Sequence, residues 1–254
     1  MRIRQAKVHG SLLMAMLAFV PCLLAQAPAP DKSGVGMAHD MSGVWNPRNI
    51  APPKQTAPFT PAGQAQFDFN TDETKEGRPI TIDPTYTCHP PGLPHAYFNS
   101  SHPFEILQTP QRIFIFHEGY HVWRTVWMDG REMPKDSDSL WMGYSIGHWD
   151  GDDLVVETAN FNDKTWIDAA GHPHSDAFKL TERFHRADHD HMKVSFTIDD
   201  PKIYTAPWGW QIDFDLKNWE IQEDYCIPED EASYFERELG TPPGKSTPAK
   251  ERAR

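Results

Sequence analysis

Histidine and aspartate recur within one short stretch of the chain, GHPHSD, at a spacing that suits metal binding. On an extended segment, side chains two residues apart point in the same direction, so His172, His174 and Asp176 would share one side. Imidazole and carboxylate groups are ligands of divalent transition metals. The stretch therefore predicts a metal site with these three ligands, completed from elsewhere, and a divalent transition metal as the candidate cofactor. A solvated loop is the alternative.

A second pair of residues could do acid–base chemistry from inside the protein. Alternation along 177–186 puts Glu182 on the apolar face, and alternation along 120–128 puts Arg124 beside valines. A charge that faces an interior is costly unless it is paired, so we expect these two side chains to pair. Two interpretations stay open. The pair is either a buried salt bridge that fixes strand order or a polar anchor in a ligand cavity, where the carboxylate would be the catalytic acid or base.

Aromatic and imidazole side chains are plentiful in the same part of the chain and could bind a ligand. The chain has nine tryptophans and thirteen histidines. Packing in a β core is the alternative role for the aromatic residues. A small apolar or aromatic molecule is the predicted ligand. The candidate ligand-binding residues are His121, Trp123, Trp141, Tyr144 and His148.

Several classes of function are not indicated. The chain has no nucleophile elbow, phosphate-binding loop, HExxH motif or dinucleotide fingerprint, which mark the enzyme classes that are easiest to recognise. Its formal net charge of −12 would repel phosphate backbones, so nucleic acid is not an expected partner. After the N-terminal region no apolar run is long enough to cross a bilayer, so no membrane span is expected.

The elements that must position these residues are strands. Apolar residues recur at every second position in ten segments, and several of the breaks between them are only two to four residues long, which is typical of antiparallel neighbours. We expect an all-β fold, an up-and-down lipocalin-like barrel, with a two-sheet sandwich as the alternative. The expected strands are 78–83, 104–109, 112–117, 120–128, 143–149, 153–158, 177–186, 192–199, 211–216 and 219–226.

Two helices are expected beside the strands. Thr60 followed by a proline predicts a short helix over 60–67, inside a proline-containing segment, 47–77, that would otherwise wrap irregularly over the surface. An amphipathic pattern predicts a second helix over 229–239, which ends at Gly240.

The N-terminal residues have the three parts of a secretory signal peptide. A basic start is followed by an apolar run over 12–24 and by the small-residue sequence Ala25-Gln26-Ala27. We therefore expect 1–27 to be a signal peptide and the protein to be exported to the periplasm or secreted. The rest divides into a flexible lead-in (28–41), one barrel domain (42–240) and a disordered tail (241–254).

Two cysteines lie beyond this leader, Cys88 and Cys226. In an exported chain such a pair is most simply a disulfide. The alternative, a pair of metal thiolates, would normally show the CxxC spacing that is missing here.

A long block of the chain resembles a widespread family of uncharacterised exported bacterial proteins. The resemblance is carried by WMGYSIGHWDGDDLVVETANFNDKTWIDAAGHPHSDAFKLTERF and the TIDDPKIYTAPW that follows. It is also carried by the earlier CHPPGLPH, PFEILQTPQRIFIFHE and MDGRE. Relatives often carry arginine where this chain has His148. The resemblance implies one exported domain in which the GHPHSD segment matters, and it implies no reaction.

Three functions fit these observations. The first is an exported barrel that binds a small molecule in a polar-lined cavity. The second is an enzyme of the isomerase, hydratase or lyase type that uses the same cavity, with a histidine-based metal site or a Glu/His acid–base pair. The third is an envelope protein that associates with carbohydrate through exposed tryptophans.

Overall fold

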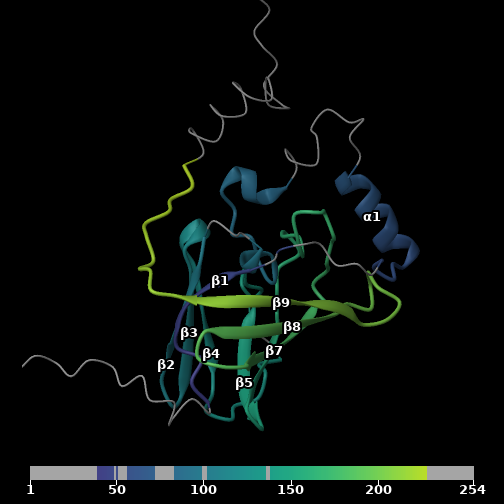
Figure 1. Ribbon diagram of the computed structural model, residues 1–254. Coiled ribbons are helices and arrows are strands. Elements are labelled where there is room, and N and C mark those ends of the chain that lie inside the picture. Colours follow the sequence, from purple (N-terminus) through teal and green to yellow (C-terminus); the bar gives the residue numbers. More distant parts are fainter. Residues whose placement is uncertain are drawn as a thin grey trace, which may run out of the picture. The chain divides into compact units, whose positions relative to one another are not determined.

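Segments in which apolar residues alternate with polar ones form nine strands in the described part of the chain, and the strands close into a barrel (Figure 1). The computed structural model describes residues 39–48, 50, 56–71, 83–98, 102–135 and 138–227. All of them lie in one of the two units into which the chain divides, Gly34–Arg254. The strands are β1 (Gly43–Pro47), β2 (Phe104–Gln108), β3 (Arg112–His117), β4 (Val122–Trp127), β5 (Tyr144–Asp150), β6 (Asp153–Ala159), β7 (Lys179–Arg186), β8 (His191–Asp199) and β9 (Trp208–Lys217).

Each strand pairs with its neighbour in the sequence, and β1 pairs with β9 to close the barrel. All pairings are antiparallel except that of β4 with β5, which is parallel. A closed ring with an odd number of alternating strands needs one parallel pair, and the long connection 128–143 supplies it because it returns to the end of the barrel where β4 began. The all-β barrel is therefore confirmed and the two-sheet sandwich is not what forms.

One α-helix and three 3-10 turns accompany the strands in the described part of the chain. They are α1 (Pro61–Thr71) and the 3-10 turns η1 (Pro84–Thr87), η2 (His95–Tyr97) and η3 (Gly119–His121). The predicted cap of α1 is present, because Thr60 Oγ1 accepts a hydrogen bond from the backbone N–H of Gly63 at 3.0 Å. The helix runs four residues beyond the expected end at Phe67. None of the described helices is both long and apolar enough to cross a membrane.

One expected strand does not form, and one strand that forms was not expected. Residues 218–227, which include the expected strand 219–226, have no regular secondary structure, and they form the yellow segment after β9 in Figure 1. The pairing of β1 with β9 leaves no free edge for another strand there. The strand β1 was not expected, because glycine, asparagine and proline interrupt its alternation.

Several expected segments lie outside the described residues. These are the signal peptide 1–27, most of the lead-in 28–41, the strand residues 78–82, the helix 229–239 and the tail 241–254. Asp83, the last residue of the expected strand 78–83, is described as the N-cap of η1.

The interior of the barrel is filled with side chains. Inward-facing aliphatic and aromatic residues of most strands are almost fully enclosed, for example Ile106, Ile115, Val126, Leu154, Phe184, Val194 and Phe214, which are 0% exposed. Tyr97 of η2 enters the interior from one end, and its ring lies 5.0 Å from the ring of Phe104 and 5.5 Å from that of Phe196. A filled barrel has its ligand sites at its rim rather than at its centre.

Candidate functional site

The two interior charges predicted from alternation form a bidentate ion pair. Arg124 on β4 donates from Nη1 to Oε2 of Glu182 at 2.6 Å and from Nη2 to Oε1 at 2.7 Å. The side chains are 2% and 0% exposed. Because two other strands lie between β4 and β7 on this side of the barrel, the pair bridges strands that do not touch. The ion pair therefore connects β4 and β7, two strands that are not neighbours in the wall, across the interior of the barrel.

Hydroxyl groups also accept hydrogen bonds from the two Nη atoms of the guanidinium, whereas its Nε is buried without a partner among the described residues. Tyr97 Oη accepts from Arg124 Nη2 at 2.6 Å, and the hydroxyls of Ser145 and Thr158 accept from Nη1 at 3.3 Å. Burial alone would lower the pKa of Arg124, but Glu182 and Tyr97 raise it above its ordinary value. Burial also raises the pKa of Tyr97. Enclosure of both charges supports the interpretation as a structural salt bridge.

A cavity of about 230 Å³ opens at the end of the barrel that carries the three 3-10 turns. It lies at this end because η2 leads into β2 and η3 joins β3 to β4. Its polar lining comes from the loop that contains η1 and η2 and from η3. The polar and aromatic lining residues are Asp83, Thr85, Tyr86, His95, Phe98 and Tyr120, and the others include Ile50, Pro91, Ala96 and Ala169.

His95 is the polar group of this cavity that the protein leaves unsatisfied. Among the described residues its Nδ1 is buried and has no hydrogen-bond partner. Burial lowers the pKa of His95 below its ordinary value, and the carboxylates of Asp83 and Asp168 only partly oppose that shift. The imidazole is therefore neutral at pH 7, with one donor and one acceptor nitrogen.

Asp83 is held in place by its role as the N-cap of η1. Its Oδ1 accepts from the backbone N–H of Thr85 at 2.9 Å and from the Thr85 hydroxyl at 2.8 Å. The Asp83 residue is 4% exposed. A carboxylate so enclosed is fixed in position beside whatever occupies the cavity.

The C-terminal segment 218–227, hereafter the strap, fastens this end of the barrel. The predicted disulfide joins Cys88, just after η1, to Cys226 of the strap. Two hydrogen bonds tie the strap to η3 as well: Gln222 N–H donates to Glu118 Oε2 at 2.8 Å, and Tyr120 N–H donates to Asp224 Oδ2 at 3.1 Å. The turns that line the cavity are thus linked covalently and by hydrogen bonds.

The predicted ligand-binding residues lie elsewhere, and none of them lines this cavity. Trp123 is on the outer face of β4 and is 57% exposed. The ring of His121 stacks on Tyr225 at 4.9 Å. Trp141 lies 5.3 Å from the ring of His89. The remaining two are both on β5: Tyr144, whose hydroxyl accepts from Arg131 at 3.0 Å, and His148, which is exposed.

The predicted metal ligands do not come together. Both ring nitrogens of His174 have protein partners, since Nδ1 donates to the carbonyl of Ser175 at 3.1 Å and Nε2 accepts from the Thr165 hydroxyl at 2.7 Å. Asp176 is exposed and pairs with Lys202. Within the described part of the chain, no group of three His, Cys, Asp or Glu side chains is placed to hold a metal ion.

His172 instead pairs with Asp168. Its Nδ1 lies 2.8 and 2.9 Å from the two carboxylate oxygens, and the two side chains are 12% and 9% exposed. The ring packs against Phe67 of α1 at 4.9 Å and against Trp208 of β9 at 5.2 Å. A carboxylate in this position holds the proton on Nδ1 and directs the lone pair to Nε2.

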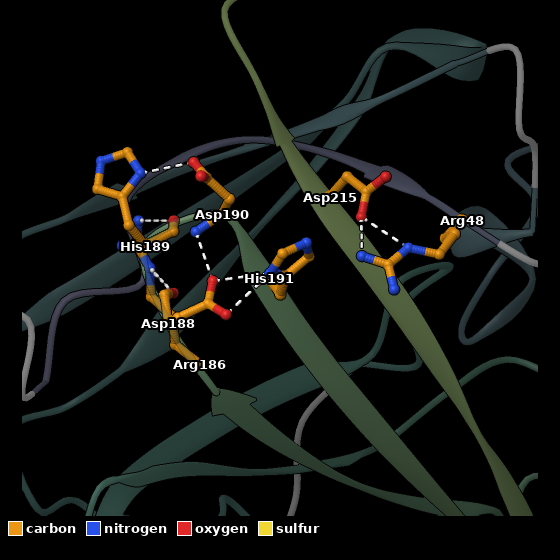
Figure 2. A network of polar contacts seen from close by, with 7 residues as sticks. All are labelled: Arg48, Arg186, Asp188, His189, Asp190, His191 and Asp215. Carbon is orange, nitrogen blue, oxygen red and sulfur yellow. Dashed lines mark hydrogen bonds and ion pairs between the residues drawn. The ribbon is translucent and has the colours of Figure 1, made fainter.

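Two other His–Asp contacts among the described residues are far more exposed. Figure 2 shows them at the turn between β7 and β8, where His189 contacts Asp190 at 2.6 Å and His191 contacts Asp188 at 2.8 Å. These four side chains are 50–69% exposed. The contrast identifies His172 and Asp168 as a pair enclosed by the fold, unlike the pairs on the exposed turn.

The structure adds three residues that sequence patterns did not single out: Asp83, His95 and Asp168. His95 stands in the CHPPGLPH stretch that carries part of the resemblance, and Asp168 precedes His172 by four residues in the WIDAAGHPH stretch. Asp168 could have been found from the sequence, because an acidic residue lies only four positions before a histidine there. Comparison of the chain with models of known families, with curated proteins and with solved structures found no match.

Proposed function

We propose that the protein is an exported barrel that binds a small molecule in the cavity between η1, η2 and η3. The observation that carries the proposal is His95, a neutral imidazole in the cavity wall whose Nδ1 has no partner among the described residues. A buried polar group without a partner costs free energy, and a ligand that bonds the ring would offset that cost.

The size of the cavity limits the ligand. An apolar cavity of about 150 Å³ is known to accept benzene, so the 230 Å³ here suits a molecule with one ring or a branched chain and a few polar atoms. Aromatic walls and a few fixed polar groups are typical of small-molecule sites.

Export is part of the proposal. It is supported by the basic start, apolar run and small-residue site of 1–27 and by the Cys88–Cys226 disulfide, which is stable in an oxidising compartment. The resemblance to exported bacterial proteins supports the same compartment.

The test is ligand-observed NMR with a set of neutral and charged one-ring compounds. Ala169 is exposed and lines the cavity, so Ala169→Trp should fill the opening without disturbing the core. Its exposed neighbour Ala170 does not line the cavity, so Ala170→Trp is the matched control. We expect binding that Ala169→Trp abolishes and Ala170→Trp retains. Absence of any compound with that pattern, together with no small molecule released on denaturation, would reject the proposal.

A proton-transfer enzyme is the second candidate, and the enclosed His172–Asp168 pair is the observation that favours it. A histidine oriented in this way contributes about 10²–10⁴-fold as a general base. An activity found in a screen of isomerase, hydratase and lyase substrates should fall by that factor in both His172→Gln and Asp168→Asn. His191→Gln, which alters the exposed pair of Figure 2, should leave it unchanged. Full activity in Asp168→Asn would exclude this role.

A further inference from the structure

The walls of the cavity are aromatic, and its charge is negative. Tyr86, Phe98 and Tyr120 supply rings, and Asp83 supplies a carboxylate. Among the described lining residues none is lysine or arginine. An anionic ligand would therefore face a carboxylate without a basic partner, which costs binding free energy.

The surroundings of His95 point in the same direction. The carboxylates of Asp83 and Asp168 both act on its ring, and both favour a positive charge there. Burial nevertheless keeps the imidazole neutral, so His95 does not cancel the negative potential of the two acids. The cavity therefore combines a negative potential with the rings of Tyr86, Phe98 and Tyr120.

We infer that the ligand of this cavity is a small organic cation, a substituted ammonium compound, held by Asp83 and by the rings of Tyr86, Phe98 and Tyr120. This inference rests on the proposed binding function and adds the chemical class of the ligand.

The chemistry of such cations suits these walls. The face of an aromatic ring carries partial negative charge and attracts a cation, by an amount that grows when water is excluded. An alkylated ammonium is weakly hydrated, so it loses less on entering an aromatic cavity than an inorganic cation or a primary amine would. The buried carboxylate of Asp83 then supplies the counter-charge.

The experiment compares two probes of equal shape that differ in charge. Choline carries a quaternary ammonium, and 3,3-dimethylbutan-1-ol carries a neutral carbon in its place. Calorimetric or NMR titration of the full mature chain should give an affinity for choline at least about tenfold higher than for the alcohol, in line with cation–π and ion-pair energies. Ala169→Trp should abolish the binding of choline, and Ala170→Trp should retain it.

Two variants that each remove one negative charge test whether the carboxylate of Asp83 causes the preference for choline. Asp83→Asn keeps the N-cap of η1, because asparagine caps helices as well as aspartate, and should reduce the preference for choline to less than about threefold. Asp188→Asn removes the same charge from the exposed turn of Figure 2, at the other end of the barrel, and should leave the preference unchanged. Together these outcomes would support the inference.

The failures of the two proposals are distinguishable. Equal or tighter binding of the alcohol, or choline binding that survives Ala169→Trp, overturns the inference and leaves the proposed binding function standing. A third outcome has the same meaning: neither probe binds at about 20 mM, well above a dissociation constant on the order of 1 mM, while one-ring compounds still bind in a way that Ala169→Trp abolishes. If neither the two probes nor any one-ring compound binds in the cavity, both proposals are overturned.

Discussion

At the scale of single residues, His117 couples the stability of the barrel to pH. It lies at the end of β3, with its ring 4.8 Å from that of Tyr97 and 5.6 Å from that of Phe104. Burial, helped by the charge of Arg124, lowers the pKa of His117 to about 3. In the unfolded chain a histidine takes up a proton near pH 6.5. Protonation therefore favours the unfolded state as the pH falls from about 6.5 toward 3.

We predict that the free energy of unfolding falls by up to about 1.4 kcal/mol per pH unit in this window from His117 alone, or about 2 kcal/mol between pH 7 and pH 5. The lowered pKa values of His95 and His174 act with the same sign. Urea unfolding at several pH values measures the slope. His117→Phe should reduce it, and the exposed control His191→Phe should not. An identical slope in His117→Phe would contradict the assignment.

The ion pair of Arg124 and Glu182 gives a second prediction at this scale. Glu182→Gln keeps the shape of the side chain but leaves the guanidinium buried without its counter-charge, so it should lower the free energy of unfolding by about 3–5 kcal/mol. The double variant Arg124→Met, Glu182→Leu removes both charges and should lose less than the single one. Chemical denaturation of the wild type, Arg124→Met, Glu182→Leu and the double variant measures the coupling between the two side chains. If the double variant loses more free energy of unfolding than the two single variants together, the two side chains stabilise the barrel by more than neutralising each other's charge.

At the scale of elements, α1 is docked through a glycine. Gly63 approaches the loop between β8 and β9 so closely that an added Cβ would lie 2.2 Å from the carbonyl oxygen of Ile203. At its other end, Asn70 Nδ2 donates to the carbonyl of Gly171 at 2.8 Å, beside His172. The helix thus braces the loop that carries the His172–Asp168 pair.

This contact reverses the usual effect of alanine in a helix. Gly63→Ala should lower the free energy of unfolding by more than 1 kcal/mol, although alanine normally stabilises a helix by about 0.5–1 kcal/mol relative to glycine. Thermal unfolding measures the change. Ala65→Gly, at an exposed position of the same helix, is the control for propensity and should lower stability by at most about 1 kcal/mol. A more stable Gly63→Ala protein would refute the close contact.

Local patterns predicted the strands well because burial on one face leaves a period-two signal. Eight of the nine strands fall within or overlap segments found in this way. The same rule placed Arg124 and Glu182 inside, since residue parity fixes the face. It failed for β1, where Gly43, Asn46 and Pro47 break the alternation. It also failed for the strap, whose side chains alternate but find no free strand edge.

The cavity could not be predicted in this way because loops form it. Asp83 and His95 lie in a loop whose position depends on a disulfide to the strap and on packing against distant segments. Gly92, for example, lies so close to Thr165 that a Cβ would meet its Oγ1 at 2.4 Å. Such contacts join residues far apart in the sequence and leave no periodic trace. Residue type and a spacing of two residues suggested His172 and His174 as ligands of one metal, but they could not show that the two side chains have different partners.

At the scale of the whole molecule, the disulfide constrains a large loop. Cys88 and Cys226 are 138 residues apart, so the bond removes much of the freedom of the unfolded chain. The double variant Cys88→Ser, Cys226→Ser should lower the free energy of unfolding by about 2–5 kcal/mol. Denaturation with and without reductant measures this, and the reductant should affect the wild type and not the variant. Equal stability of the oxidised wild type and the variant would contradict it.

The pairing of β1 with β9 has a consequence for how the chain reaches this fold. Val44 cannot meet Lys217 until nearly the whole described chain has been made. Contacts between such distant residues raise the contact order, and mostly β proteins of this kind fold in milliseconds to seconds rather than microseconds. Until then β1 and β8 present open edges that invite pairing with other chains. A chain that stops before Trp208 would keep those edges open, so aggregation rather than a smaller barrel is its expected fate.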